Sequence, residues 1–278
     1  MEPLQWCRQR LLVAGNPLTA TLPFAATEHR DAILSLRSVI SEIAAGTGGV
    51  SEPEPGLARL EWWRQALRED NPHPAVRALS ETGARDRFEP AAFDLLIDGV
   101  SESLTNPRFE SMTSAWQFFE RVGGQAGVLE ARLLEDQGDH SEAFRQIGAC
   151  GYLIRAVRDL AIDARANRWL VPLDLQADFQ VSRQDAIGQA SGPAFDGMVR
   201  AMLAEGIKKA ESAIDQLDAG PAWRHRHQIL QWSLEYRLAR LLARKPQRIL
   251  LERVLPGHAG NVWCVWRQAR QLRRRLKT

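Results

Sequence analysis

The chain has 278 residues, of which 45% are hydrophobic and 25% charged, and its formal net charge is +2. These values are ordinary for a globular domain, and the small charge neither requires nor excludes nucleic acid. The cysteines, Cys7, Cys150 and Cys264, form no CxxC pair, which excludes a zinc framework and suits a reducing compartment. Because the sequence shows neither a signal peptide nor about eighteen consecutive apolar residues, we expect a cytoplasmic protein without a membrane-spanning helix.

Helical periodicity dominates the chain. In RDAILSLRSVISEIAA the apolar side chains recur on one broad helical face, formed by Ala32, Ile33, Leu36, Val39, Ile40 and Ile43. Similar patterns predict further helices over residues 57–69, 89–104, 110–136, 141–165, 194–218, 223–243 and 258–276. Proline and glycine separate these segments, and no stretch alternates with period two. The sequence therefore predicts a single all-α domain, residues 1–278, of about ten helices.

Two carboxylates lie four residues apart in the stretch LIRAVRDLAIDARANRWLVPLDL. On a helix, Asp159 and Asp163 share one edge of the buried stripe, in line with Tyr152 and Arg155. Two carboxylates one turn apart are able to hold Mg²⁺, which in turn grips a diphosphate. The alternative is a ladder of charges, Arg155–Asp159–Asp163, on a solvated helix face.

The segment RDLAIDARANRWLVPLDL resembles the second aspartate-rich motif of the squalene/phytoene synthase family. Four upstream segments, in the same order as in that family, extend the resemblance over about residues 3–175: ATLPFAATEHRDAILSLR, LEWWRQAL, NPHPAVRAL and FFERVGGQAGVLEARLL. The resemblance implies an all-α prenyl-synthase bundle with a central cavity, in which Mg²⁺ supports the head-to-head condensation of two prenyl diphosphates. If diphosphate binding is retained, we expect Arg155, Asp159, Asp163 and Arg168 to bind the diphosphate, and Asp159 and Asp163 to bind the metal.

The first aspartate-rich motif of that family is absent from this chain. Counted without gaps from Arg30, its two carboxylates would fall at Ala44 and Gly48, and neither residue can ligate a metal. Glu42 is nearby, but it is an isolated carboxylate that we expect to point elsewhere on the helix. Because a magnesium cluster must be held from both sides, this loss predicts that condensation does not occur.

Further departures surround the second motif. Tyr152 and Arg155 replace a glutamine and an asparagine of the family pattern, while Glu120 and Leu170 stand where it has tyrosines. A guanidinium one turn before Asp159 can neutralise that carboxylate where Mg²⁺ would otherwise bind. We therefore predict an ion pair between Arg155 and Asp159 that replaces a metal.

The stretch RDAILSLRSVISEIA is more similar to a divergent branch of the family, which includes a mitochondrial complex I assembly factor. That resemblance implies a catalytically degenerate protein that acts as an assembly or lipid-binding accessory protein. An active, Mg²⁺-dependent transferase with an altered site is the alternative. We expect no cofactor, or Mg²⁺ where residual diphosphate binding persists. The expected partners are a prenyl or other lipid ligand and a protein of a membrane complex, with no nucleic acid.

The remaining histidines and tryptophans have ordinary interpretations. His73 lies between prolines and is expected in a loop, and His225 and His227, two residues apart, face different sides of a helix. Most of the nine tryptophans lie on predicted helices, where they indicate core packing or, alternatively, the lining of a tunnel for a prenyl or acyl chain.

The C-terminal stretch VWCVWRQARQLRRRLKT combines aromatic and basic residues. Trp263 and Trp266 precede a cluster of cations that ends at Lys277. Such a helix is able to lie on anionic lipid, which predicts peripheral membrane contact. The alternative is a final bundle helix whose cations are favourably placed at the negative end of its dipole.

Overall fold

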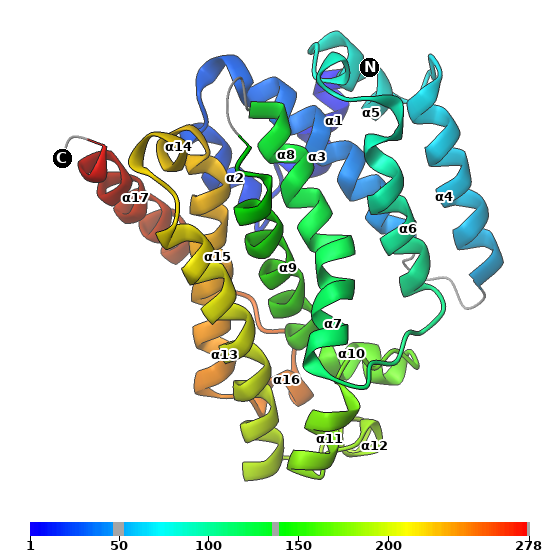
Figure 1. Ribbon diagram of the computed structural model, residues 1–278, viewed down its shortest axis with the longest axis vertical. Helices are drawn as coiled ribbons and strands as arrows, with labels where there is room; N and C mark the ends of the chain where they lie inside the picture. The colour runs from blue at the N-terminus through cyan, green and yellow to red at the C-terminus, as the bar shows by residue number, and fades with distance from the viewer. Residues whose placement is uncertain (47–52, 135–138, 277–278) are drawn as a thin grey trace.

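The computed structural model describes residues 1–46, 53–134 and 139–276, and in these ranges every regular element is helical (Figure 1). The prediction of an all-α fold is therefore confirmed. The α-helices are α1 (Pro3–Leu11), α2 (Pro17–Thr21), α3 (Arg30–Ala45), α4 (Pro53–Arg68), α5 (Pro74–Glu81), α6 (Asp94–Ser103), α7 (Met112–Phe119), α8 (Gln125–Leu134), α9 (Ser141–Arg158), α10 (Leu160–Arg165), α11 (Leu173–Phe179), α12 (Arg183–Ile187), α13 (Pro193–Asp215), α14 (Ala219–Arg224), α15 (Arg226–Arg244), α16 (Arg248–Leu251) and α17 (His258–Arg275). Short 3-10 turns lie at Leu22–Phe24, Thr27–His29, Arg85–Arg87 and Pro90–Phe93.

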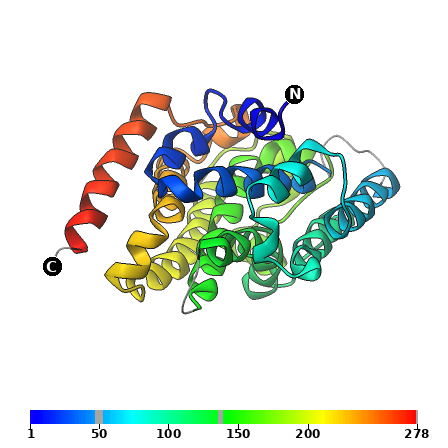
Figure 2. The same ribbon diagram turned by 90° about the horizontal axis from the view of Figure 1, so that it is seen from above.

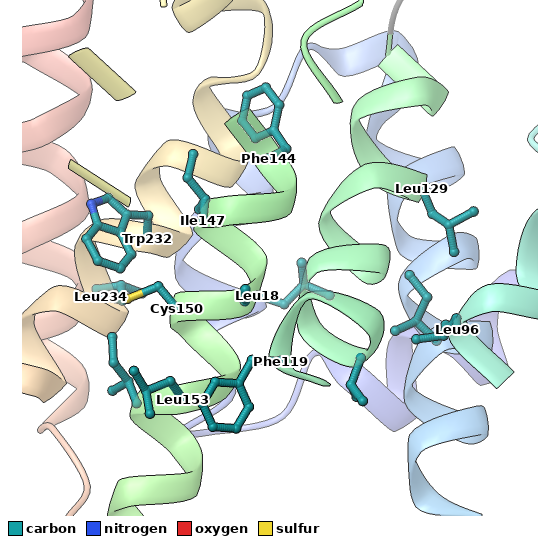
Figure 3. Close-up of a cluster of buried hydrophobic side chains, with 14 of the residues drawn as sticks. Leu18, Leu96, Phe119, Leu129, Phe144, Ile147, Cys150, Leu153, Trp232 and Leu234 are labelled. Carbon is teal, nitrogen blue, oxygen red and sulfur yellow. The ribbon is translucent and has the colours of Figure 1, made fainter. Parts of the chain in front are cut away.

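Helix α9 forms the centre of the bundle. It packs against α8 on one side and against α13 and α15 on the other. Figure 3 shows its buried side chains, with Ile147 and Cys150 pointing toward Trp232 of α15. Phe144, Cys150 and Leu153 are completely buried, and each apolar side chain removed from water in this way stabilises the fold by about 1.5–3 kcal/mol. The C-terminal end of α9 lies in the lower half of the bundle, near α10 and α16 (Figure 1). Asp159 is the residue that caps this end.

Three predicted helices are interrupted in the structure. A π-helical turn, Glu120–Gly124, separates α7 from α8 inside the predicted segment 110–136. Asp159 has φ −95° and ψ 7°, which ends α9 at Arg158 inside the predicted segment 141–165. His225 interrupts the segment 223–243 in the same way, with φ −89° and ψ 19°. All three interruptions occur where residues contact parts of the chain that are distant in sequence, such as Arg253 for Asp159 and Phe144 for His225, and hydrophobic periodicity carries no record of such contacts.

Glycines bring the π-helical turn and α8 into backbone contact with α9. A Cβ atom added to Gly148 would lie 2.2 Å from the carbonyl oxygen of Gly123, and one added to Gly127 would lie 2.2 Å from that of Phe144. Real Cβ atoms do not approach oxygen so closely, so only glycine permits this helix spacing. The interior between α8 and α9 is therefore narrow.

We expect Gly148→Ala to lower the free energy of unfolding by about 1–3 kcal/mol, because the added methyl group forces two backbones apart. Gly220→Ala is the matched control, since its Cβ would meet no atom within 4 Å. Thermal and denaturant unfolding of both variants would measure the difference. Equal stabilities for the two variants would contradict the close backbone contact.

Candidate functional site

A cavity of about 170 Å³ lies where α9 ends, and it brings together the residues predicted to bind diphosphate. It is lined by Ser103, Asn106, Pro107, Tyr152, Arg155, Ala156, Asp159, Asp163, Arg168, Trp169 and Leu170. A second cavity, of about 60 Å³, lies deeper between α8, α9 and α15 and shares Arg155 with the first. Protein ligand pockets usually hold about 300–1,000 Å³, so both interior cavities are small.

Asp159 is held by two arginines. Arg158 Nε donates to Asp159 Oδ1 at 2.9 Å, and Arg253 Nε donates to the same oxygen at 2.8 Å. The Nη2 atoms of both arginines donate to Oδ2. Burial alone would raise the pKa of Asp159, but these two guanidiniums outweigh it and lower the pKa. The carboxylate thus has two fixed cations on its two oxygens.

Asp163, one turn further on, pairs with Arg168. Their side chains form an ion pair, and the Arg168 backbone N–H donates to the Asp163 carbonyl at 2.7 Å. Burial raises the pKa of Asp163, with a further increase from the neighbouring Asp159 carboxylate, and Arg168 opposes the rise only in part. Burial and the Asp163 carboxylate also raise the pKa of Tyr152 to about 12, so its hydroxyl stays protonated.

The predicted ion pair between Arg155 and Asp159 is wrong. Arg155 Nη1 instead donates to Glu235 Oε1 of α15 at 2.6 Å. The helical hydrogen bond from the Asp159 N–H to the Arg155 carbonyl is formed at 3.0 Å, so the backbone spacing is as predicted; the nearly buried Glu235 carboxylate of α15 takes the guanidinium instead. Two other arginines, Arg158 and Arg253, form the ion pairs with Asp159. The sequence therefore identified a neutralised Asp159 but assigned the wrong cation.

The residues present do not fit a magnesium cluster. Both oxygens of Asp159 already accept two charged hydrogen bonds, so a metal would have to displace both arginines. On α3, Ala44 offers no ligand and Glu42 is paired with Arg10 at 2.9 Å; Gly48 lies outside the described residues. In the described ranges no three His, Cys, Asp or Glu side chains are grouped so as to hold a metal.

The bundle interior contains a buried ionic cluster that sequence reasoning missed. Glu130 of α8 is 0% exposed, forms an ion pair with Arg37 of α3, and contacts His227 Nδ1 of α15 at 2.8 Å. His227 Nε2 reaches the hydroxyl of Thr21 at 3.1 Å. Burial would raise the pKa of Glu130, but Arg37 and His227 outweigh it and lower the pKa to about 2. The only signal in the sequence was a single carboxylate on an otherwise apolar segment, GVLEARLL.

His73 and His225 both have hydrogen-bonding or packing roles within the fold. His73 caps the N-terminus of α5, where its Nδ1 accepts from the Ala75 N–H at 3.2 Å, and its ring packs edge-on against Trp63. His225 is buried beside Phe144 and its Nδ1 lies 3.3 Å from Gln228 Oε1. Burial lowers the pKa of His225 to about 4, so the ring is neutral at pH 7.

Comparison with known proteins agrees with this geometry. The family described as squalene/phytoene synthase matches residues 15–258. The chain belongs to the squalene/phytoene synthase family. Among solved structures, a dehydrosqualene synthase in complex with ligand superposes with a TM-score of 0.78 at 13% identity, covering 98% of this chain and 96% of the other. YisP from Bacillus subtilis has a TM-score of 0.73 at 14% identity, covering 95% of each chain. The predicted isoprenoid synthase fold is thereby confirmed.

Curated relatives of this squalene/phytoene synthase family chain fall into two kinds. "NADH dehydrogenase (ubiquinone) complex I, assembly factor 6" of Mus musculus is 24% identical over 171 residues, which are 59% of this chain and 51% of the relative. "15-cis-phytoene synthase" of Synechococcus elongatus is 22% identical over 189 residues, which are 62% of this chain and 60% of the relative. The chain thus spans about half the length of the assembly factor that it matches.

We expect Arg155→Ala to lower the free energy of unfolding by about 1–3 kcal/mol, because it leaves the nearly buried Glu235 carboxylate without its cation. Arg77→Ala is the control, since it breaks an exposed i,i+4 pair with Glu81 that contributes about 0.5 kcal/mol or less. Chemical denaturation measures both. If the two variants lose the same stability, the Arg155–Glu235 pair is no stronger than a surface pair.

We expect the free energy of unfolding to decrease in two steps as the pH is lowered from 7. His225 has a pKa of about 4 in the fold and about 6.5 when unfolded, so between these pH values only the unfolded chain binds the proton and stability drops as pH falls. Glu130, with a pKa of about 2 folded against about 4.3 unfolded, extends the loss below pH 4.3. Melting temperatures measured from pH 7 to 3 check this.

His225→Asn should flatten the upper part of this pH profile, between about pH 6.5 and 4, and leave the lower part unchanged. A variant with the same slope as the unmodified protein above pH 4.5 would show that the His225 ring does not limit acid stability.

Proposed function

We propose that the chain is a catalytically degenerate member of the squalene/phytoene synthase family that acts as an assembly or lipid-binding accessory protein. The observation that carries the proposal is the pairing of Asp159 with Arg158 and Arg253. Ionising a prenyl diphosphate requires cations aimed at the leaving phosphates, since electrostatic stabilisation is usually the largest catalytic effect. Here the carboxylate that would hold such a cation is neutralised by the protein itself.

The size and polarity of the interior support the same proposal. Condensation of two prenyl diphosphates needs room for two long apolar chains, whereas the cavity at Asp159 and the one between α8, α9 and α15 hold about 170 and 60 Å³. A neighbouring pocket of about 550 Å³ shares Asn106 and Trp169 with the Asp159 cavity, but Arg108, Asn167, Arg183 and other polar side chains are among its lining. The cavity of about 60 Å³ is lined in part by Arg37, Gln228 and Glu235, which an apolar chain would have to desolvate. The space between α3, α8, α9 and α15 thus favours a structural role.

A retained diphosphate-binding site, with or without transferase activity, is the second candidate. Two residues that line the 170 Å³ cavity have a buried donor atom, Arg168 Nε and Trp169 Nε1, with no acceptor in the described structure. Arg155 and Arg168 side chains are 40% and 39% exposed, so both remain accessible to an anion. In this case Arg155, Asp159, Asp163 and Arg168 would bind the diphosphate, with Mg²⁺ on Asp159 and Asp163 only after the arginines had moved.

The assembly role is suggested by the similarity to complex I assembly factor 6. A protein partner within a membrane complex and a prenyl or other lipid ligand are the expected interactions. Within residues 1–46, 53–134 and 139–276 no helix has the length and apolarity needed to cross a bilayer. We therefore propose a cytoplasmic protein that contacts the membrane peripherally, through α17, whose end carries Arg273, Arg274 and Arg275.

Pyrophosphate release tests the proposal. The purified protein is incubated with farnesyl or geranylgeranyl diphosphate and Mg²⁺, with an active dehydrosqualene synthase assayed in parallel. We expect no release above the rate without protein, and no rise of the melting temperature with Mg²⁺ alone, because the metal lacks a free carboxylate pair. Squalene- or phytoene-type product above background would overturn the degenerate assignment. Saturable diphosphate binding without release would support the second candidate in its non-catalytic form.

A further inference from the structure

The largest groove described lies outside the bundle interior, between α15 and α17, and has a volume of about 780 Å³. Helix α17 lies at the outer edge of the molecule in both views (Figures 1 and 2). The groove opens to the surface, since Arg240, Arg244 and Trp263 in its lining are exposed. Its volume exceeds that of both interior cavities together and falls within the range of ligand pockets.

Specific contacts join α15 and α17 along the groove. Arg237 of α15 donates through Nη1 to the side-chain oxygen of Asn261 at 2.5 Å and to the carbonyl of Gly257 at 3.4 Å. Gly260 makes room for this contact, because a Cβ there would lie 2.2 Å from Arg237 Nη2. Further along, Cys264 Sγ lies 3.7 Å from the Ser233 carbonyl. The two antiparallel helices are thus joined at the base of the groove.

All charged side chains that line the groove are arginines. They are Arg237, Arg240 and Arg244 from α15 and Arg267 from α17. Arg240, Arg244 and Arg267 are exposed, and residues 258–278 contain no aspartate or glutamate at all. Four guanidiniums without an acidic residue among the lining side chains favour an anionic ligand.

The apolar part of the lining is as distinctive as the charge. Tyr236, Leu241, Trp263 and Cys264 line the groove between the arginines. Trp263 is 62% exposed and stacks on Trp266, with ring centroids 5.0 Å apart, and the Arg270 guanidinium lies 4.7 Å from the centre of the Trp266 ring. Stacked, exposed tryptophans beside arginines are typical of the boundary between membrane headgroups and acyl chains.

We propose that the groove between α15 and α17 binds one anionic phospholipid of a bilayer, with an acyl chain along Leu241 and Trp263 and the phosphate held by Arg240, Arg244 and Arg267. This proposal rests on the lipid-binding role proposed above, but it uses none of the residues that line the cavity at Asp159. The apolar lining and the purely basic rim together match a molecule that has one apolar and one negatively charged end. A neutral lipid would satisfy the first part only.

Dihexanoyl phosphatidylglycerol, kept below its critical micelle concentration, tests the groove without a membrane. Isothermal titration calorimetry with the full chain should show saturable binding with one site, at least about tenfold tighter than for dihexanoyl phosphatidylcholine. The triple variant Arg240→Gln, Arg244→Gln, Arg267→Gln should lose this preference. Trp263→Ala should weaken binding of both lipids, because it removes apolar surface and no charge. Absence of saturable binding to the unmodified protein would overturn the proposal.

A second triple variant controls for net charge. Arg59→Gln, Arg77→Gln, Arg108→Gln removes three exposed arginines, none of which lines the groove; α4 and α5, which carry the first two, lie at the opposite side of the bundle from α17 (Figure 1). It should keep the affinity of the unmodified protein for both short lipids and for vesicles of phosphatidylglycerol and phosphatidylcholine. If both triple variants lose the same affinity, general electrostatic attraction explains the binding and the groove is not a lipid site.

Sedimentation velocity and the pyrophosphate assay separate the remaining outcomes. A dimer that the groove variant dissociates would show that a second copy of the chain covers this surface, and it would overturn the proposal. Pyrophosphate release together with lipid binding would overturn the degenerate site and leave the groove intact. Lipid binding without pyrophosphate release is the result we expect.

Discussion

A carboxylate in the middle of the bundle dictates much of its architecture. Glu130 has no exposure to solvent, and an unpaired charge at such a position would cost several kcal/mol. Its partners, Arg37 and His227, come from α3 and α15, so one buried anion joins three helices that are far apart in the sequence. The ion pair also requires polar side chains in the space between these helices. An interior organised in this way favours one fixed arrangement of helices over an open apolar chamber.

The glycine contacts also reduce the free volume inside the bundle. Gly123, Gly127 and Gly148 let α9 approach the π-helical turn and α8 until backbone touches backbone, and the cavity that these glycines line holds only about 60 Å³. The fold matches that of dehydrosqualene synthase, but the cavity at Asp159 and the one between α8, α9 and α15 are small. The same arrangement of helices can enclose cavities of different size, because the volume left for a ligand depends on each interior side chain.

Two regions of the molecule use arginine in different ways. Around Asp159 and Asp163, arginines neutralise each carboxylate, and the region is nearly balanced. Between α15 and α17, by contrast, arginines face solvent beside exposed tryptophans and without acidic residues in the lining. The same residue type thus stabilises the protein at one end of the molecule and provides a recognition surface at its edge. Burial and the presence of a carboxylate partner make the difference.

The sequence by itself determined the all-α class, the positions of the longer helices, the family, and the loss of the first aspartate motif at Ala44; it missed α1, α2, α5, α11, α12 and α16 and the interruptions within three segments. The features that it determined depend on periodicity and residue identity, which are local. It also predicted that an arginine would neutralise Asp159. Only the tertiary structure decided which one, since Arg253 lies 94 residues away and Glu235 of α15 takes the Arg155 guanidinium. The Glu130 cluster and the groove beside α17 were equally hidden, because ion pairs and grooves between helices depend on distances that a linear pattern does not contain.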